Sequence, residues 1–290
     1  MTPLAALALC RFAGDGAALL LWGACAYLAW LVPGDLGAVI AGRLRTPTAA
    51  AVAVAVGASL AGLPVLAASM GDGWRDALDP AVAGAVLTGT GGGRTWAVQA
   101  VAAALLSACR CGPARTRLGG TASAAALWLT GLVLTGHAVM DEGWRGVIHR
   151  GTDALHVLAA GAWLGALMPV LLILPRLARA EDRASAALAL RRFSRAGHVA
   201  VALVLLTGAL DAALVLGRWP TQLASPYEAL LDLKLVAVLA MVALAVVNRY
   251  LFVPRLPPSL TALRRATLAE LPLGLAAVAL VAVFGLLDPG

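Results

Sequence analysis

Residues 152–175 read TDALHVLAAGAWLGALMPVLLILP, and this stretch decides the fold class. Its 24 residues are almost all apolar, and Asp153 and His156 are the exceptions that can ionise. A helix needs about 20 consecutive apolar residues to cross the hydrocarbon core of a membrane. Only a helix satisfies its own backbone hydrogen bonds there. The stretch therefore predicts a membrane-spanning helix.

The whole sequence has the composition of a protein that crosses the membrane many times. Hydrophobic residues make up 61% of the 290 positions and charged residues 13%, and the mean hydropathy is +0.88. A soluble domain does not have this composition. We expect an all-α fold, a polytopic integral membrane helical bundle of about eight transmembrane helices, forming a single domain over residues 1–290. The expected spans are residues 4–32, 48–70, 94–110, 118–140, 152–175, 197–217, 227–252 and 266–287.

The first and third of these spans are the least ordinary. Residues 1–9 contain no basic residue, whereas a secretory signal peptide begins with a positive segment, so we expect the first stretch to remain as a span. The third span is short, and the segment 80–93 before it ends in three glycines. This segment predicts either an interfacial helix or a re-entrant piece.

Arginine supplies all but one of the 22 basic residues, and it sets the expected orientation. The arginines lie mostly in short segments between spans, which favours orientation on a membrane over nucleic-acid binding. They cluster in alternate loops, which are expected to be cytoplasmic, so both termini are expected outside. The clusters are Arg43 and Arg45; Arg110, Arg115 and Arg117; Arg176, Arg179, Arg183, Arg191, Arg192 and Arg195; and Arg249, Arg255, Arg264 and Arg265.

Several ionisable residues lie inside the expected spans, where each needs a partner or a role. Arg11 and Asp15 are four residues apart and can pair on one helix face. Five further residues are Asp153, Asp211, Asp232 and Lys234 in the outer half, and Glu270 near the inner side. Two interpretations remain open: a hydrated polar cavity in the outer half, or local pairs within a dry bundle.

Three of the four histidines, His137, His149 and His156, surround one expected outer loop, and Met140 follows closely after His137. A tight hairpin would bring His137 and His156 to one depth in the membrane. Imidazole together with thioether sulfur suits copper, and Asp153 is placed to orient the His156 ring. The alternative for each histidine is a hydrogen-bonded structural role.

Other soft or aromatic side chains have plainer interpretations. Met70 is either a further sulfur ligand or an ordinary helix end, and Cys109 and Cys111 are expected to be inert thiols rather than metal ligands. His198 is expected at the inner interface. Trp163 lies seven residues after His156 on the same helical face. It either forms the bottom of the site or packs against a neighbouring helix.

Motifs of several enzyme classes are absent from the sequence. It contains no P-loop, no His-Glu-x-x-His zinc motif and no Gly-x-Ser-x-Gly nucleophile motif. We therefore do not expect an enzyme.

A series of short motifs resembles the copper resistance protein D family of bacterial inner-membrane proteins. Their order and spacing carry the resemblance, although Ala166 and the segment 225–228 depart from the family's pattern. The motifs are Gly136-His137-Ala138, Asp153-x-x-His156, Trp163-x-Gly165, Arg192-Phe193-Ser194, Thr207-Gly208 and Leu233-Lys234.

The resemblance implies a multi-pass protein of the bacterial inner (cytoplasmic) membrane that moves or handles copper, as Cu(I) or Cu(II). It also implies a periplasmic partner, a copper-binding protein of the copper resistance C type, besides membrane lipid. His137 and His156 are the ligands carried over from the family, and His149 and Met140 rest on the residues alone. We expect copper uptake from the periplasm toward the cytoplasm. Two alternatives are a haem-binding redox protein and a docking subunit that recruits a copper carrier without transporting the metal.

Overall fold

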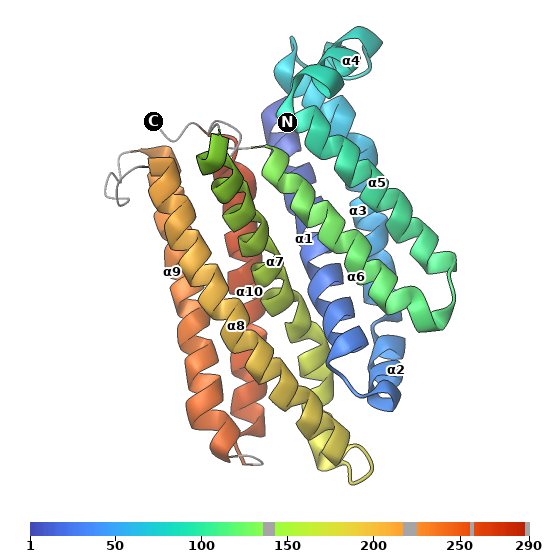
Figure 1. Cartoon of the computed structure of the whole chain (residues 1–290), viewed down its shortest axis with the longest axis vertical. Helices are drawn as coiled ribbons and strands as arrows, with labels where there is room; N and C mark the ends of the chain where they lie inside the picture. The colour runs from blue at the N-terminus through green and yellow to red at the C-terminus, as the bar shows by residue number, and fades with distance from the viewer. Residues whose placement is uncertain (136–142, 217–224, 256–257, 288–290) are drawn as a thin grey trace.

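The computed structural model describes residues 1–135, 143–216, 225–255 and 258–287, and the parts of the chain that it describes are helical, without strands. Long helices run roughly side by side along one axis (Figure 1). They are α1 (Pro3–Trp30), α3 (Arg45–Met70), α5 (Gly91–Cys111), α6 (Ala114–Gly131), α7 (Gly143–Ile173), α8 (Arg183–Leu216), α9 (Pro226–Val247) and α10 (Leu260–Phe284). These confirm the expected polytopic helical bundle.

Shorter elements connect or extend the long helices. Two of them are α-helices, α2 (Gly34–Arg43) and α4 (Pro80–Gly89). The 3-10 turns are η1 (Trp74–Asp76), η2 (Leu132–Leu134), η4 (Leu174–Ala178) and η6 (Val253–Arg255), and η5 (Asn248–Phe252) is a turn of π-helix.

Within the described ranges, seven helical segments are long and apolar enough to cross a membrane. Helix α5 occupies the place of the third expected span but does not belong to these seven, and it contains the polar residues Arg94, Gln99 and Arg110. It still packs along α3 and α6 for its whole length (Figure 1). The segment before it forms α4, a short helix at the end of the bundle beyond α3 and α5 (Figure 1).

The start of α1 and the end of α10 lie at the same end of the bundle, at the top of Figure 1. We call this the terminal end. The loops that carry the arginine clusters lie at the opposite end, together with α2, and we call that the arginine-rich end. The alternation of loops expected from the charge pattern is therefore present in the fold.

Helices α7 and α8 are longer than expected, and two expectations about loops were wrong. Helix α8 begins at Arg183 rather than near residue 197, so much of the third arginine cluster is helical. This segment is rich in Ala, Leu and Arg, which are strong helix formers, and no Pro or Gly interrupts it before Gly197. Helix α7 begins at Gly143 rather than near residue 152, which places His149 on a helix instead of in a loop.

Glycine allows α1 and α7 to approach closely at the centre of the bundle. A Cβ added at Gly23 of α1 would lie 2.1 Å from the carbonyl oxygen of Gly161, and one added at Gly165 would lie 2.4 Å from that of Leu19. Trp22 fixes the same contact by donating its indole N–H to the Leu158 carbonyl, at 2.8 Å. Close packing on small residues is how helices associate in lipid, where burying apolar surface gives no driving force.

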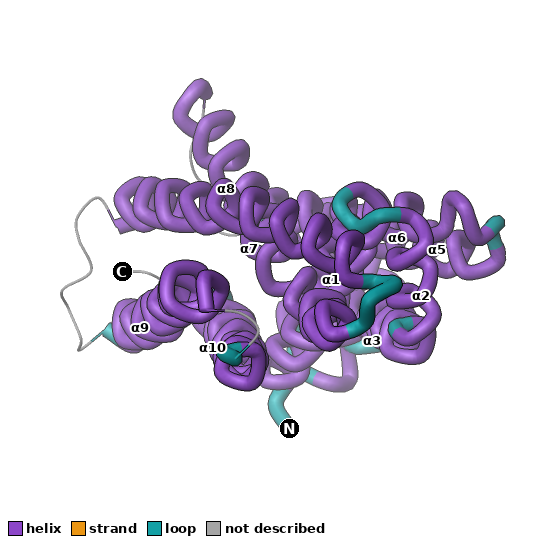
Figure 2. The backbone as a smooth tube through the Cα atoms, turned by 90° about the horizontal axis from the view of Figure 1, so that it is seen from below, coloured by secondary structure: helices purple, strands orange, loops and turns teal. Residues whose placement is uncertain are grey.

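The rest of the bundle is arranged around this central pair. Helices α1, α3, α5 and α6 share one core around Trp128 and Leu106. Helices α9 and α10 form a hairpin that joins the bundle through α10, which packs on α1 and α7. Seen along the bundle axis, the hairpin lies beside α7 (Figure 2), and α8 packs on α7 and contacts α9 through apolar side chains. Helix α7 is therefore central, and it carries three of the predicted site residues, His149, Asp153 and His156.

Candidate metal site

One face of α7 carries a column of polar side chains toward the terminal end. His149, Thr152, Asp153 and His156 follow the spacing i, i+3, i+4, i+7, which places them on one side of the helix. They meet Thr207 and Asp211 of α8, and Lys234 of α9 lies within electrostatic reach. We call these seven residues the His156 group. The sequence-based prediction placed residues 143–151 in a loop, and therefore did not place His149 on this helix face.

The His156 ring is held by α8. Its Nδ1 lies 3.0 Å from the hydroxyl oxygen of Thr207. A Cβ added at Gly208 would lie 3.1 Å from the ring's Cε1 and 3.4 Å from Nδ1, so glycine leaves the space that the ring fills. The consecutive Thr207 and Gly208 therefore position one imidazole between α7 and α8.

The hydrogen bonds of Thr207 decide which ring nitrogen of His156 remains available. The Thr207 hydroxyl donates to the Leu203 carbonyl at 2.6 Å, so toward His156 its oxygen acts as an acceptor. The neutral imidazole must then carry its proton on Nδ1 and donate it to Thr207. Nε2 then carries the lone pair, and no described residue is hydrogen-bonded to it. Histidine binds metal in this form, with the other nitrogen fixed by a hydrogen bond.

The second level of the His156 group lies closer to the terminal end. The Thr152 hydroxyl lies 2.6 Å from a carboxylate oxygen of Asp211 and donates to it, and His149, which is 3% exposed, interacts electrostatically with the same carboxylate. Lys234 interacts electrostatically with Asp153 and Asp211. Charges of both signs are thus gathered from three helices, which lowers the cost of each within the membrane.

Arg11 and Asp15 lie in a different place from the His156 group. A carboxylate oxygen of Asp15 accepts from Trp128 Nε1 at 2.8 Å and from Gln99 Nε2 at 3.4 Å, while Arg11 donates to the Gly285 carbonyl at 3.3 Å. The direct Arg11–Asp15 ion pair expected from their spacing is not formed, because each side chain is engaged by another helix. We call Arg11, Asp15, Gln99 and Trp128 the Asp15 group.

The terminal end of α10 separates the two polar groups. Lys234 lies over the Phe284 ring, 5.7 Å from its centroid, and Tyr227 packs on the same ring at 5.3 Å. The next residue, Gly285, accepts the hydrogen bond from Arg11. The structure therefore places the predicted polar residues in two groups rather than around one common cavity.

The other predicted residues are dispersed. Met70 lies on α3 beside a cavity of about 330 Å³ that the Asp15 group lines, away from His156. Asp232 is half-buried on α9, and His198 is exposed on α8, where its Nδ1 lies 2.6 Å from the Ser194 carbonyl of its own helix. His137 and Met140 lie outside the described residues. Cys109 and Cys111 end α5 as free cysteines at the arginine-rich end.

Among the described residues, no three His, Cys, Asp or Glu side chains form a cluster that would hold a metal ion. His149 and His156 are seven residues apart on one helix, which is about 10 Å along the axis. The two imidazoles therefore lie at different levels of the helix. His156 is the described residue best placed as a ligand, because its Nε2 is free and its ring is fixed.

Two family models match the chain. Residues 1–147 match "Copper resistance protein D-like, N-terminal domain", and residues 187–284 match "Copper resistance protein D". The chain belongs to the copper resistance protein D family. The family resemblance drawn from the short motifs is thereby confirmed.

Three relatives of known name are similar to this member of the family. "Inner membrane protein YebZ" of Escherichia coli (strain K12) is 38% identical over 248 residues, which are 85% of this chain and 84% of the relative. "Copper resistance protein D" of Pseudomonas syringae pv. tomato is 37% identical over 141 residues, 47% of this chain and 43% of the relative. "Copper transport protein CutJ" of Bacillus subtilis (strain 168) is 29% identical over 252 residues, 83% of this chain and 45% of the relative. No solved structure matches the chain.

Family membership and the apolar helices together make this a multi-pass protein of the inner membrane with a copper-related function. Several family motifs meet at one place in the fold. Thr207-Gly208 holds the His156 ring, and Lys234 approaches it from α9. From the sequence, Thr207 and Gly208 were motif residues without a predicted role, and Thr152 was not among the predicted site residues. Its position four residues before His156 was the signal.

Proposed function

We propose that this protein takes up copper across the inner membrane, with His156 as a central ligand in the outer half. The observation that supports this most directly is the hydrogen-bonded His156 ring, whose Nε2 carries the free lone pair. Family membership supports copper as the metal. The charge pattern supports the orientation, because the arginine-rich end is expected in the cytoplasm and the terminal end in the periplasm.

The ligands act in sequence along α7 in this proposal. His149 lies two turns closer to the terminal end than His156, so copper meets it first and passes to His156. His137 and Met140, from the segment before α7, complete the coordination of the ion at His156 with imidazole and thioether, a combination that suits copper in either oxidation state. Asp153, Asp211 and Lys234 keep this region polar and adjust its charge, whereas Arg11 and Asp15 form no part of it. Asp232 has no assigned part.

Copper reaches the terminal end from a periplasmic copper-binding protein of the copper resistance C type, and no chemical conversion by this chain is needed. The transport proposal differs from two alternatives in what the purified protein does. A docking subunit would bind the carrier without passing copper into sealed vesicles. A haem-binding redox protein would show a Soret absorption band.

Copper binding and flux of the purified protein in proteoliposomes test the proposal. We expect His156→Ala to lose copper binding and uptake into vesicles, because the fixed imidazole is removed. The matched control is His198→Ala, which removes an exposed histidine hydrogen-bonded within its own helix and should keep the bound copper per protein. Equal copper binding and uptake in wild type and His156→Ala would contradict the proposal.

A further inference from the structure

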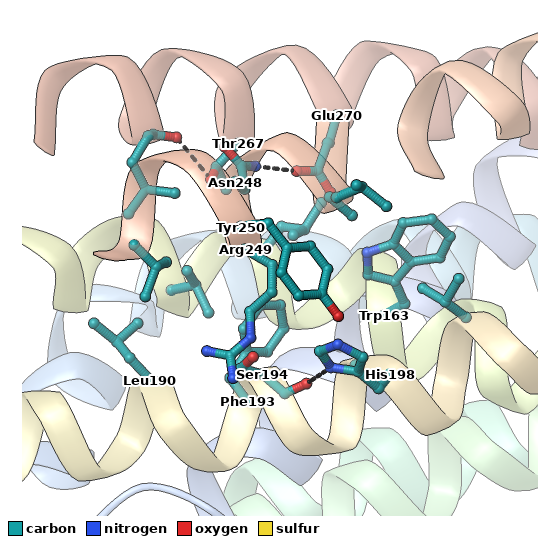
Figure 3. Close-up of a pocket in the computed structure, with 18 of the residues that line it drawn as sticks. Trp163, Leu190, Phe193, Ser194, His198, Asn248, Arg249, Tyr250, Thr267 and Glu270 are labelled. Atoms are coloured by element: carbon teal, nitrogen blue, oxygen red, sulfur yellow. Dashed lines mark hydrogen bonds between the residues drawn. The ribbon is translucent and has the colours of Figure 1, made fainter. Parts of the chain in front are cut away.

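A second cavity, of about 540 Å³, lies toward the arginine-rich end between α7, α8, α10 and the π-helical turn η5 (Figure 3). Apolar side chains make up most of its lining. Trp163 of α7 lines this cavity and lies two helical turns closer to the arginine-rich end than His156. The same face of α7 therefore connects the His156 group with this cavity. The cavity therefore lies where the inner half of the proposed copper pathway is expected.

A buried carboxylate and a buried amide meet at this cavity. Glu270 of α10 is 2% exposed and accepts a hydrogen bond of 2.7 Å from Asn248 Nδ2 (Figure 3). Asn248 is 8% exposed, and its Oδ1 has no hydrogen-bond partner among the described residues. Native proteins rarely leave such an acceptor unsatisfied in their interior, and an exception calls for an explanation, such as an unseen hydrogen-bond donor.

The backbone is irregular on both helices that carry this pair. Asn248 begins the π-helical turn η5, which interrupts the regular hydrogen bonding of the α9 segment. Pro272, two residues after Glu270 inside α10, has no N–H to donate to the carbonyl four residues earlier. Interrupted helices inside membrane proteins occur where they line a cavity, often at binding sites for ions or substrates.

Glu270 has no basic partner within the described parts of the chain, where no ion pair to it forms. From α8, Arg191 and His198 line the same cavity, and from η5, Arg249 and Tyr250 do so. Figure 3 shows the Arg249 guanidinium beside Ser194, away from Glu270. The residues of α7 that face the Glu270 carboxylate are uncharged. One of them, Trp163, interacts with the carboxylate through its side chain. On α1, which also packs on α10, the charged side chains are Arg11 and Asp15, both engaged in the Asp15 group near the terminal end.

The chemistry around Glu270 suits a proton better than a metal ion. Hard cations such as Mg²⁺ and Ca²⁺ take about six or more oxygen ligands, whereas one carboxylate and one amide oxygen meet here. Copper prefers imidazole and sulfur ligands, which this pair does not offer. A proton needs only the carboxylate, and it turns a buried charge into a neutral O–H donor. Asn248 supports both forms, because its Nδ2 donates to the carboxyl group while its Oδ1 accepts from an O–H.

We propose that Glu270 is a proton-binding site that exchanges protons with the arginine-rich side of the membrane through the 540 Å³ cavity. The step is the reversible conversion of the carboxylate and a proton from water at that side into the carboxylic acid. A second part rests on the copper transport proposed above: Glu270 is the residue through which a proton gradient acts on that transport.

Infrared spectroscopy of the purified protein in lipid tests the proton site without any copper. We expect the C=O absorption of a protonated carboxyl group to rise as the pH falls, to be absent in Glu270→Gln, and to remain in the control Asp15→Asn. In Asn248→Leu, which keeps the carboxyl group, the band should shift to higher frequency because the C=O loses its hydrogen bond. A pH-dependent band that is identical in wild type, Glu270→Gln and Asn248→Leu, or no pH-dependent band in the wild type, would overturn the proposal.

Proteoliposomes with an imposed pH gradient test the coupling. Wild-type copper flux should change severalfold with the gradient, and Glu270→Gln flux should be independent of it. An equal response in both would overturn the coupling. Absence of copper flux from the wild type would refute the proposed function and with it the coupling, while the infrared result would still decide whether Glu270 binds a proton.

Discussion

The His156 group and the Asp15 group both place ionisable side chains near the terminal end, but they use hydrogen bonds differently. Asp15 accepts from two neutral donors, Trp128 and Gln99, that reach it from α6 and α5. The His156 ring bonds through Nδ1 to a hydroxyl that is already committed as a donor and also interacts with the Val204 backbone, and among the described residues its Nε2 has no hydrogen-bond partner. The first arrangement joins helices, and the second leaves a ring nitrogen for the copper ligand that we propose.

This difference shows that ionisable residues inside a membrane bundle do not form one class. Each carries a desolvation cost, which helix-to-helix hydrogen bonds offset in the Asp15 group and which the proposed copper binding explains in the His156 group. Trp128 is 2% exposed within the shared core of α1, α3, α5 and α6, which fits a structural role for its partner Asp15. Substitutions in the two groups should therefore affect different measurements.

The largest effect on copper binding, among changes that keep every proposed ligand, is expected for Gly208→Val. A Cβ at this position already lies 3.1 Å from the His156 ring, and the two methyl groups of valine would displace the imidazole. Changes to residues that orient a ligand weaken metal affinity by about 10- to 100-fold, and we expect an effect in that range. Competition with a copper chelator on the purified protein measures it.

The matched control for this substitution is Gly197→Val on the same helix, where an added Cβ meets no atom within 4 Å. It should leave the copper affinity near that of the wild type. Equal affinities for the two variants would mean that Gly208 does not position the ligand, and the comparison between the two groups would lose its main support.

A smaller loss, of about tenfold, is expected for Thr207→Val. Valine keeps the shape of threonine but removes the oxygen that accepts from Nδ1, so the proton is no longer confined to that nitrogen. Thr207→Ser should restore the affinity because it returns the hydroxyl. Thr130→Val removes a comparable hydroxyl, one bonded to the Leu127 carbonyl of its own helix, and should have no effect on copper. The same chelator competition decides between these outcomes.

Much of the fold could be predicted from the sequence because length and hydropathy are local properties. The apolar stretch at residues 152–175 becomes the greater part of α7, and the arginine clusters mark one end of the bundle, as expected. Helix starts were predicted less well, since segments such as 183–196 are polar but have high helix propensity. The hydropathy of such a segment does not reveal that its helix continues beyond the membrane.

The site could be predicted in part. His156 and the polar residues near it were found because ionisable groups are rare in apolar spans. The division into two groups could not be predicted, because it depends on contacts between helices. At the terminal end of α10, Phe284 contacts Lys234 of α9 and Gly285 contacts Arg11 of α1. The pairing of Asn248 with Glu270 could not be predicted either, because it joins residues on two different helical segments.

The smallest effect on copper is expected for Asp15→Asn, and it would complete the comparison. Asparagine keeps one oxygen to accept from Trp128 but loses the negative charge, so the hydrogen bonds that join α1 to α6 and α5 become weaker. We expect the free energy of unfolding to fall by about 1 kcal/mol, measured by denaturant titration in detergent. The copper affinity should stay at the wild-type value, because Asp15 lies on the opposite side of α10's terminal end from Lys234 and the His156 group. A loss of copper affinity as large as that in Thr207→Val, with unchanged stability, would instead place Asp15 on the copper pathway and join the two groups into one.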